Sequence, residues 1–149
     1  MKLQQLFEGR GINLIGYHYS HNANLDYLDP KKHGTGIRGA ERTRARDYPE
    51  YYNKERAYLY SDPNKKESGL GNNKYKAKLI KVYDMVSDPD GLKKKAQVKA
   101  QEISGVVADM NLAATLFENM ILEKGYNGYY NKKAGIIIYF KKVDVEKAA

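Results

Sequence analysis

The sequence predicts a single compact α+β domain with a mixed or antiparallel β-sheet at its core and helices flanking the sheet. Three observations predict this fold class: strand-like segments come first, a helical region fills the second half, and a short apolar run closes the chain. The chain has 149 residues, of which 42% are hydrophobic and 30% charged, a balance typical of one globular domain spanning residues 1–149.

The first 85 residues contain three strand-like segments, at residues 12–20, 56–63 and 74–85. In the first, INLIGYHYS, two tyrosines share one face, while His18 and Ser20 share the other. The second, RAYLYSDP, ends in a Ser-Asp-Pro turn, and the third carries lysines at alternate positions, which indicates an exposed side. These three segments are the expected strands of the sheet.

Polar segments rich in Asn, Asp, Pro and Gly separate these strands and predict loops at residues 21–36 and 64–73. Residues 40–55 predict at most a short helix before Pro49, because their hydrophobic pattern is weak. Residues 93–124 then follow a helical pattern, with apolar residues recurring every four positions and a Lys-Gly stop at its end.

The closing segment contains two further signals. Asn127-Gly128 predicts a turn, and the run GIIIYF at residues 135–140 predicts a short central strand. Three strands come before the helices, a strand or hairpin follows them, and there is no internal repeat, so the sheet is expected to be mixed or antiparallel.

Charge and cysteine content narrow the class of protein. The formal net charge is +8, which favours polyanionic partners such as nucleic acid, nucleotide phosphates or an acidic protein surface. The chain contains 14 tyrosines and no cysteine. Without cysteine there are no disulfides or thiolate metal sites, and without a signal-peptide pattern or a long apolar stretch we expect a cytoplasmic protein that does not enter a membrane.

Several common catalytic motifs are absent from the sequence. There is no GxxxxGK[ST] motif, no HExxH motif and no GxSxG motif, so a P-loop ATPase is not expected and no metal site is predicted. The stretch GTGIRG, residues 34–39, lacks the preceding strand of a dinucleotide fingerprint. Its Gly34 and Thr35 can still bring backbone amides close to a phosphate.

A histidine and an aromatic strand form the sharpest functional pattern. His18 lies near the end of the first strand, and Tyr58 and Tyr60 share a face of the second, which ends at Ser61. On neighbouring strands these groups can hold a ribose and stack on a flat base. The alternative for His18 is a histidine with a purely structural role.

These motifs resemble those of the ADP-ribosyltransferase fold, in the branch marked by a His-Tyr-Glu signature. GYHYS is similar to its first motif, RAYLYSDP to its second, and residues 123–145 to its closing segment. Residues 28–41 and 83–92 are also similar to segments of the small ADP-ribosyltransferase-like domains of phage polyvalent proteins. The resemblance implies an NAD cofactor, ribose contacts from His18, Tyr19 and Ser20, and aromatic contacts from the second strand.

The acid of the third motif is missing. The family places a glutamate at the start of the third-motif strand, whereas this chain reads Lys-Ala-Gly-Ile at residues 133–136. A carboxylate is needed because cleavage of the C–N bond of NAD passes through an oxocarbenium-like state. Glu41 and Glu67 are the candidates to replace it, and the alternative for Glu41 is an ion pair with a nearby arginine.

The arginines around Glu41 are candidates for phosphate contacts. Arg38, Arg42, Arg44 and Arg46 can grip the pyrophosphate of NAD or the phosphates of a nucleic acid, because a guanidinium matches phosphate oxygens bidentately. The alternative is a solvated helix face without a ligand.

Three interpretations therefore remain open from the sequence. The first is a phage-encoded, NAD-dependent ADP-ribosyltransferase that modifies a host protein or nucleic acid, such as a component of a defence system. The second is a catalytically inactive domain of the same fold, which grips nucleic acid or a nucleic-acid-handling protein through a basic, tyrosine-rich surface. A third, plainer interpretation is an accessory domain cut from a larger phage polyprotein.

Overall fold

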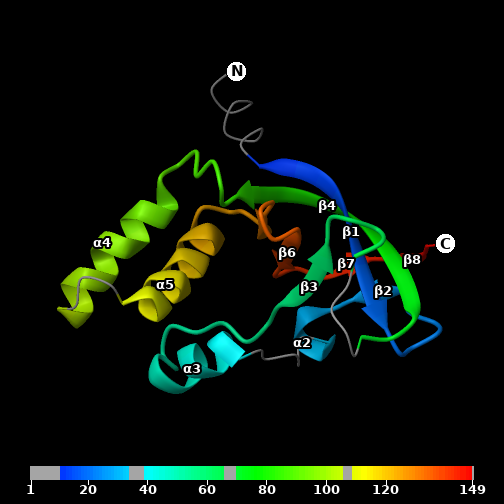
Figure 1. The fold of residues 1–149 in the computed structure, drawn as a ribbon, viewed down its shortest axis with the longest axis horizontal. Helices are drawn as coiled ribbons and strands as arrows, with labels where there is room; N and C mark the ends of the chain where they lie inside the picture. Colours follow the sequence, from blue (N-terminus) through cyan, green and yellow to red (C-terminus); the bar gives the residue numbers. More distant parts are fainter. Residues whose placement is uncertain (1–10, 34–38, 66–69, 106–108, 149) are drawn as a thin grey trace.

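The computed structural model describes residues 11–33, 39–65, 70–105 and 109–148. Within them lie four helices and eight strands, and Figure 1 labels these elements. In chain order they are β1 (Ile12–Ser20), β2 (Tyr27–Leu28), α2 (Pro30–His33), α3 (Gly39–Asp47), β3 (Ala57–Tyr60), β4 (Asn73–Asp84), α4 (Leu92–Ser104), α5 (Met110–Glu123), β5 (Gly128–Asn131), β6 (Ile136–Tyr139), β7 (Val143–Asp144) and β8 (Glu146–Lys147).

The main sheet has six strands in the order β1-β3-β6-β5-β4-β8, and β1 also pairs with β4. The first five strands therefore form a closed ring. All pairings are antiparallel except that of β4 with β5, which is parallel. A two-stranded sheet of β2 and β7 completes the β structure. The expectation of an α+β fold with a mixed sheet is confirmed.

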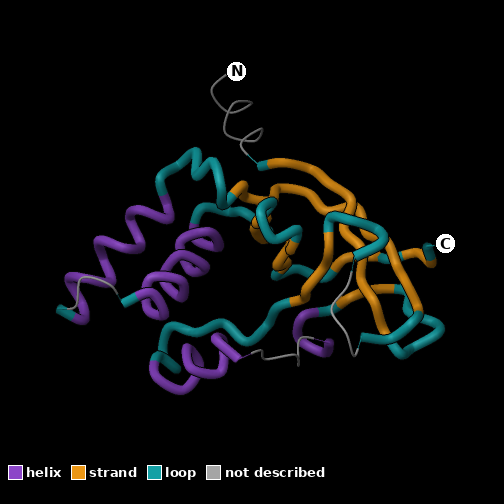
Figure 2. The backbone as a smooth tube through the Cα atoms, viewed as in Figure 1, coloured by secondary structure: helices purple, strands orange, loops and turns teal. Residues whose placement is uncertain are grey.

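The parallel pair explains where the helices lie. Parallel neighbours need a long crossover connection, and α4 and α5 form the one between β4 and β5. Figure 2 shows that these two helices lie together on one side of the molecule and most strands on the other. No helix in the described ranges has the length and apolar character required to cross a bilayer.

One cluster of buried side chains lines the inside of the ring. Leucine, isoleucine, valine, alanine and tyrosine side chains from β3, β4 and β6 meet there, with Leu28 of β2 packed against them. Gly16 of β1 faces this cluster. A Cβ on Gly16 would lie 2.8 Å from the Leu79 side chain and 2.9 Å from that of Leu59. The absence of a side chain at Gly16 therefore lets β3 and β4 approach each other across the ring.

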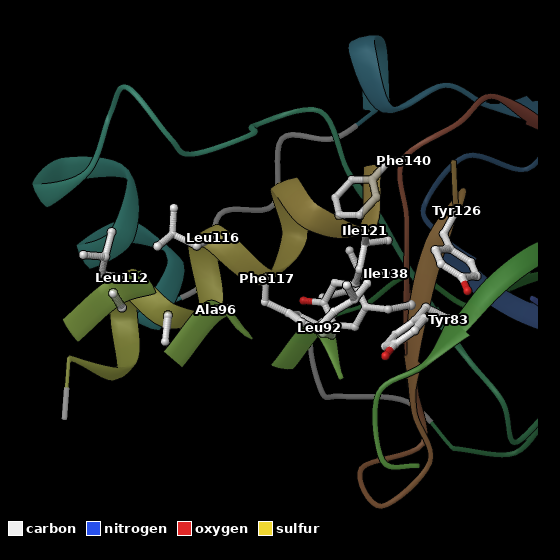
Figure 3. Close-up of a cluster of buried hydrophobic side chains, with 13 residues drawn as sticks. Tyr83, Leu92, Ala96, Leu112, Leu116, Phe117, Ile121, Tyr126, Ile138 and Phe140 are labelled. Atoms are coloured by element: carbon white, nitrogen blue, oxygen red, sulfur yellow. The ribbon is translucent and has the colours of Figure 1, made fainter. Parts of the chain in front are cut away.

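A second cluster joins the sheet to the helices (Figure 3). Its members from α4 and α5 pack on aromatic residues of the sheet and its loops, and Phe117 makes edge-to-face contacts with Tyr83 and Tyr129. Gly105 ends α4 with φ of 72°, and the Asp109 side chain caps α5 by accepting a hydrogen bond from the Leu112 amide at 3.0 Å.

The predicted elements agree with the structure at most places. The first strand has the predicted bounds, the strands at 56–63 and 74–85 form as β3 and β4, and α3 is the short helix before Pro49. Residues 21–36, predicted as loop, also contain β2 and α2.

The predicted turn at Asn127-Gly128 is wrong. Gly128 begins β5 and pairs with Tyr139, and the hairpin turn lies at residues 132–135. Gly128 is required by packing, because a Cβ there would lie 2.2 Å from the Ile138 carbonyl oxygen.

Candidate functional site

His18 lies on the inner side of the ring. It pairs with Tyr75 of β4, which alternates with the inward-facing Ala77 and Leu79. The His18 side chain is half-buried, and its Nδ1 lies 3.0 Å from the Tyr58 carbonyl oxygen. Because a carbonyl oxygen only accepts, Nδ1 donates this hydrogen bond, which fixes the ring orientation. Two of the predicted site residues, His18 and Tyr58, are thereby joined.

The aromatic side chains of β3 face the opposite way. Tyr17 pairs with Tyr60, so these two tyrosines share a face. Tyr58 packs against the second hydrophobic cluster, which joins the sheet to the helices. The Tyr19 ring lies edge-on to that of Tyr60, with centroids 6.1 Å apart. The structure therefore brings Tyr19, rather than the His18 ring, to the aromatic face of β3.

Two serines lie at the ends of these strands. Ser20 Oγ accepts a hydrogen bond from the Asn22 amide at 3.0 Å. The Ser61 amide donates to the Gly135 carbonyl oxygen at 3.1 Å, which ties the end of β3 to the turn before β6. Both hydroxyls lie where the strands pass into loops, as the sequence predicts.

Glu41 is buried in the first turn of α3, and it contacts two groups of the β3 segment. Its Oε1 lies 3.5 Å from Arg56 Nη1. Burial raises the pKa of Tyr58, and the Glu41 carboxylate beside its hydroxyl raises that pKa further. Glu41 thus lies beside a predicted site residue, and it also forms the ion pair that was the alternative interpretation.

Glu118 of α5 is the centre of this buried cluster, and the sequence did not indicate it. Its carboxylate accepts hydrogen bonds from Arg56 at 2.7 and 2.9 Å, from Arg44 at 2.6 Å and from the Tyr129 hydroxyl at 2.6 Å. Arg44 also donates to the Thr115 hydroxyl at 2.9 Å. We call these residues the Glu118 network: Glu41, Arg44, Arg56, Thr115, Glu118 and Tyr129.

The Glu118 network balances its charges, with two guanidinium groups and two carboxylates. Burial lowers the pKa of Arg56, but the Glu118 carboxylate more than offsets this, so the pKa lies above its usual value. Burial, and then the Glu118 charge, raise the pKa of Tyr129 well above 10. The Tyr52 ring covers Arg56, with the guanidinium carbon 4.6 Å from the ring centroid.

The Glu118 network holds Arg44 apart from Arg42 and Arg46, which the sequence also predicts as phosphate contacts. Arg44 is buried against Glu118, so it does not lie on a common surface with the exposed Arg42. Arg46 is exposed and pairs with Asp47 at 2.8 Å. For Arg44, the expected phosphate contact is replaced by a structural ion pair, because Glu118 supplies the carboxylate inside the fold.

The remaining predicted residues are placed as follows. Gly34, Thr35, Arg38 and Glu67 lie outside the described residues. The turn at residues 132–135, directly before β6, contains no acid. In the part of the chain that the structure describes, no group of three or more His, Asp or Glu side chains is arranged to hold a metal ion.

Fold and site together define an α+β domain whose mixed sheet carries a histidine and tyrosines on adjacent strands beside a buried carboxylate–arginine network. Comparison with known proteins found no matching family model, no matching curated protein and no matching solved structure.

Proposed function

We propose that this chain is an NAD-dependent ADP-ribosyltransferase, the activity that its motifs resemble. The observation that supports this most strongly is the strand order. β3 lies between β1 and β6, so the strands that carry the three motifs are direct neighbours. One dinucleotide can contact all three motifs only if they lie side by side, because catalysis depends on holding the reacting groups in a fixed geometry.

In this proposal each group has a defined role. His18 and Ser20 bind a ribose, and the rigid orientation of the His18 ring supports this role. Nicotinamide stacks on Tyr58 or Tyr60 across the strand ends, because both side chains lie on the opposite face of the sheet from His18. Arg42 contacts phosphate. The acceptor is a host protein or nucleic acid of a phage-infected cell, with a defence component as a candidate.

Glu41 is the described carboxylate best placed to replace the missing acid. It lies next to Tyr58, and its contact with Arg56 is long, at 3.5 Å. As the C–N bond of NAD breaks, positive charge develops on the ribose, and a fixed carboxylate stabilises that charge.

Incubation of the purified chain with labelled NAD and a host lysate tests the enzyme. We expect transfer of label or release of nicotinamide, loss of both in His18→Ala, and retention of both in His21→Ala. His21 is a matched control because it is an exposed histidine three residues away. If neither NAD-dependent signal is detected, or if His18→Ala behaves like the unchanged protein, the proposed activity is rejected.

A second candidate is an inactive domain of the same fold that binds a nucleic acid or a protein. One observation favours it: Glu41 is buried and ion-paired, while the turn before β6 lacks an acid. Calorimetric titration with NAD separates the two candidates. NAD binding that depends on His18 but yields no nicotinamide supports an inactive NAD-binding domain, whereas the absence of NAD binding supports a domain that recognises only a macromolecule.

A further inference from the structure

The strands β1 and β4 present an outward face on which aromatic or aliphatic residues alternate with lysines. Three cross-strand pairs follow one another along it: Tyr19 with Lys74, Tyr17 with Lys76, and Ile15 with Lys78. Residues directly opposite on antiparallel strands share a face, so all six side chains lie on the side away from the ring interior. We call these six residues the outer face: Ile15, Tyr17, Tyr19, Lys74, Lys76 and Lys78.

Half of the outer face is exposed in spite of its apolar content, and Tyr17, Tyr19 and Lys74 are half-buried. Ile15 is 40% exposed, the neighbouring Ile80 is 50% exposed, and Lys76 and Lys78 are exposed. A groove of about 480 Å³ runs over it, bordered by residues of β1, β4, β7 and β8. Exposed isoleucines next to half-buried tyrosines and lysines are unusual for a surface in contact only with water, and they are typical of a binding surface.

We propose that the outer face binds single-stranded nucleic acid. Bases stack on Tyr17 and pack against Ile15, and Lys76 and Lys78 contact the phosphates, whereas the Lys74 ammonium donates a hydrogen bond to the Pro63 carbonyl oxygen at 3.0 Å. Sheets that carry aromatic residues are a common platform for single strands, because every base has a flat face that stacks on a ring. The net charge of +8 on the whole chain attracts the strand to this surface.

Two acids border the groove and sharpen the inference. Asp144 and Glu146 lie along its wall, and Glu146 pairs with Lys76 at 3.3 Å. Both side chains of this pair are exposed, at 67% for Glu146 and 45% for Lys76, so the pair is weak and a phosphate can replace the carboxylate. The Lys78 side chain, in contrast, is exposed and makes no hydrogen bond or ion pair within the described residues, which leaves it available to a phosphate.

The inference does not depend on NAD binding, and it assigns a role to a surface on the opposite side of β1 from His18. It would apply equally to an active enzyme, whose nucleic-acid target would then be held on the opposite face of β1 from His18, and to an inactive binding domain.

The test uses fluorescein-labelled oligothymidine and oligouridine of about 20 nucleotides, with affinity measured by fluorescence anisotropy between about 50 mM and 200 mM salt. We expect Lys76→Gln with Lys78→Gln to weaken binding about tenfold, and to reduce the slope of log affinity against log salt by about 1.4, which corresponds to two phosphate contacts. Tyr17→Leu is expected to weaken binding by about tenfold through the loss of one stacked base.

Two further variants make the test specific. Glu146→Gln is expected to strengthen binding, because it removes the carboxylate that competes for Lys76. Lys95→Gln with Lys99→Gln removes the same charge from exposed positions of α4 and is expected to change the affinity less than about twofold.

Three outcomes would overturn the proposal: no binding to either oligonucleotide at about 50 mM salt, equal losses from the α4 and β4 lysine pairs, or an unchanged affinity in Tyr17→Leu. Equal binding of polyglutamate that Tyr17→Leu does not weaken would also overturn it, and would assign the face to an acidic protein. Since Tyr17 is half-buried, circular dichroism checks its folding, and the exposed lysine and Glu146 variants keep the test decisive if Tyr17→Leu does not fold.

Discussion

Replacement of Glu118 by glutamine tests whether the buried network holds the helices to the sheet. The Glu118→Gln variant would keep the size of the side chain but lose the charge that pairs with Arg44 and Arg56. Both guanidinium groups are buried, and only Glu41 would remain to compensate them, through a contact of 3.5 Å. A buried pair that loses one partner destabilises a protein by about 3–5 kcal/mol.

That loss is a large part of the stability expected for a domain of this size, which is about 5–15 kcal/mol. It corresponds to a decrease in melting temperature of roughly 10 °C. Urea denaturation followed by circular dichroism measures the free energy of unfolding directly, because the midpoint and slope give it by linear extrapolation.

Glu123→Gln is the matched control. Glu123 lies on the same helix, α5, but is exposed, so its replacement is expected to change the free energy of unfolding by less than about 0.5 kcal/mol. A Glu118→Gln variant that fails to fold while Glu123→Gln folds would correspond to the upper end of the expected loss. A loss below about 1 kcal/mol in Glu118→Gln would refute the reasoning, since it would mean that the network contributes no more than an exposed ion pair.

Three further predictions concern other parts of the fold. Gly128→Ala is expected to destabilise the β5–β6 pairing by about 1–3 kcal/mol or more, measured by urea denaturation, because its Cβ would meet the Ile138 carbonyl oxygen at 2.2 Å. The hydrogen bond to the Asp109 carboxylate raises the pKa of Tyr48 to about 12, so absorbance at about 295 nm should show a tyrosine that titrates above the usual value near 10, and Tyr48→Phe should remove it. Glu41→Gln is expected to cost only about 1 kcal/mol in the same denaturation experiment, and a loss as large as that of Glu118→Gln would contradict this.

Raised tyrosine pKa values also set the alkaline limit of stability. A tyrosine whose folded pKa lies above its unfolded value of about 10 holds its proton more tightly in the folded state, so its stabilisation is complete below about pH 10 and is lost as the pH rises through the folded pKa. For Tyr48, the stabilisation is lost between about pH 10 and 12. The pKa values of the half-buried Tyr58 and the buried Tyr129 are also raised, so their contributions are lost at still higher pH.

Local patterns predicted the elements well where the pattern extended over several residues. β1 has the predicted bounds because nine residues of strand-forming sequence end at a polar segment, and α5 follows the four-residue spacing of its apolar positions. β2 has only two residues and pairs with β7, more than 100 positions along the chain, so no local signal marks it.

The candidate site was harder to predict because it depends on register and on long-range pairing. The alternation within β1 and within β3 was clear, but only the pairing of Tyr17 with Tyr60 decides that His18 faces away from the aromatic side chains of β3. Glu118 left one trace in the sequence, an acid within the otherwise apolar run of α5, but its partners Arg44 and Arg56 lie more than 60 residues away.

The two carboxylates of the network differ in a way that bears on function. Glu118 accepts four short hydrogen bonds and is 1% exposed, so any movement of it would leave two buried guanidinium groups with only the 3.5 Å Glu41 contact to balance their charge. Glu41 is 8% exposed and contacts Arg56 at 3.5 Å, while Arg56 remains fully paired with Glu118. Arg56 would therefore keep its Glu118 pair if the Glu41 carboxylate turned toward a ligand. A buried carboxylate beside Tyr58, with an arginine behind it that Glu118 also pairs, fits the role that we propose for Glu41 in stabilising charge on the ribose.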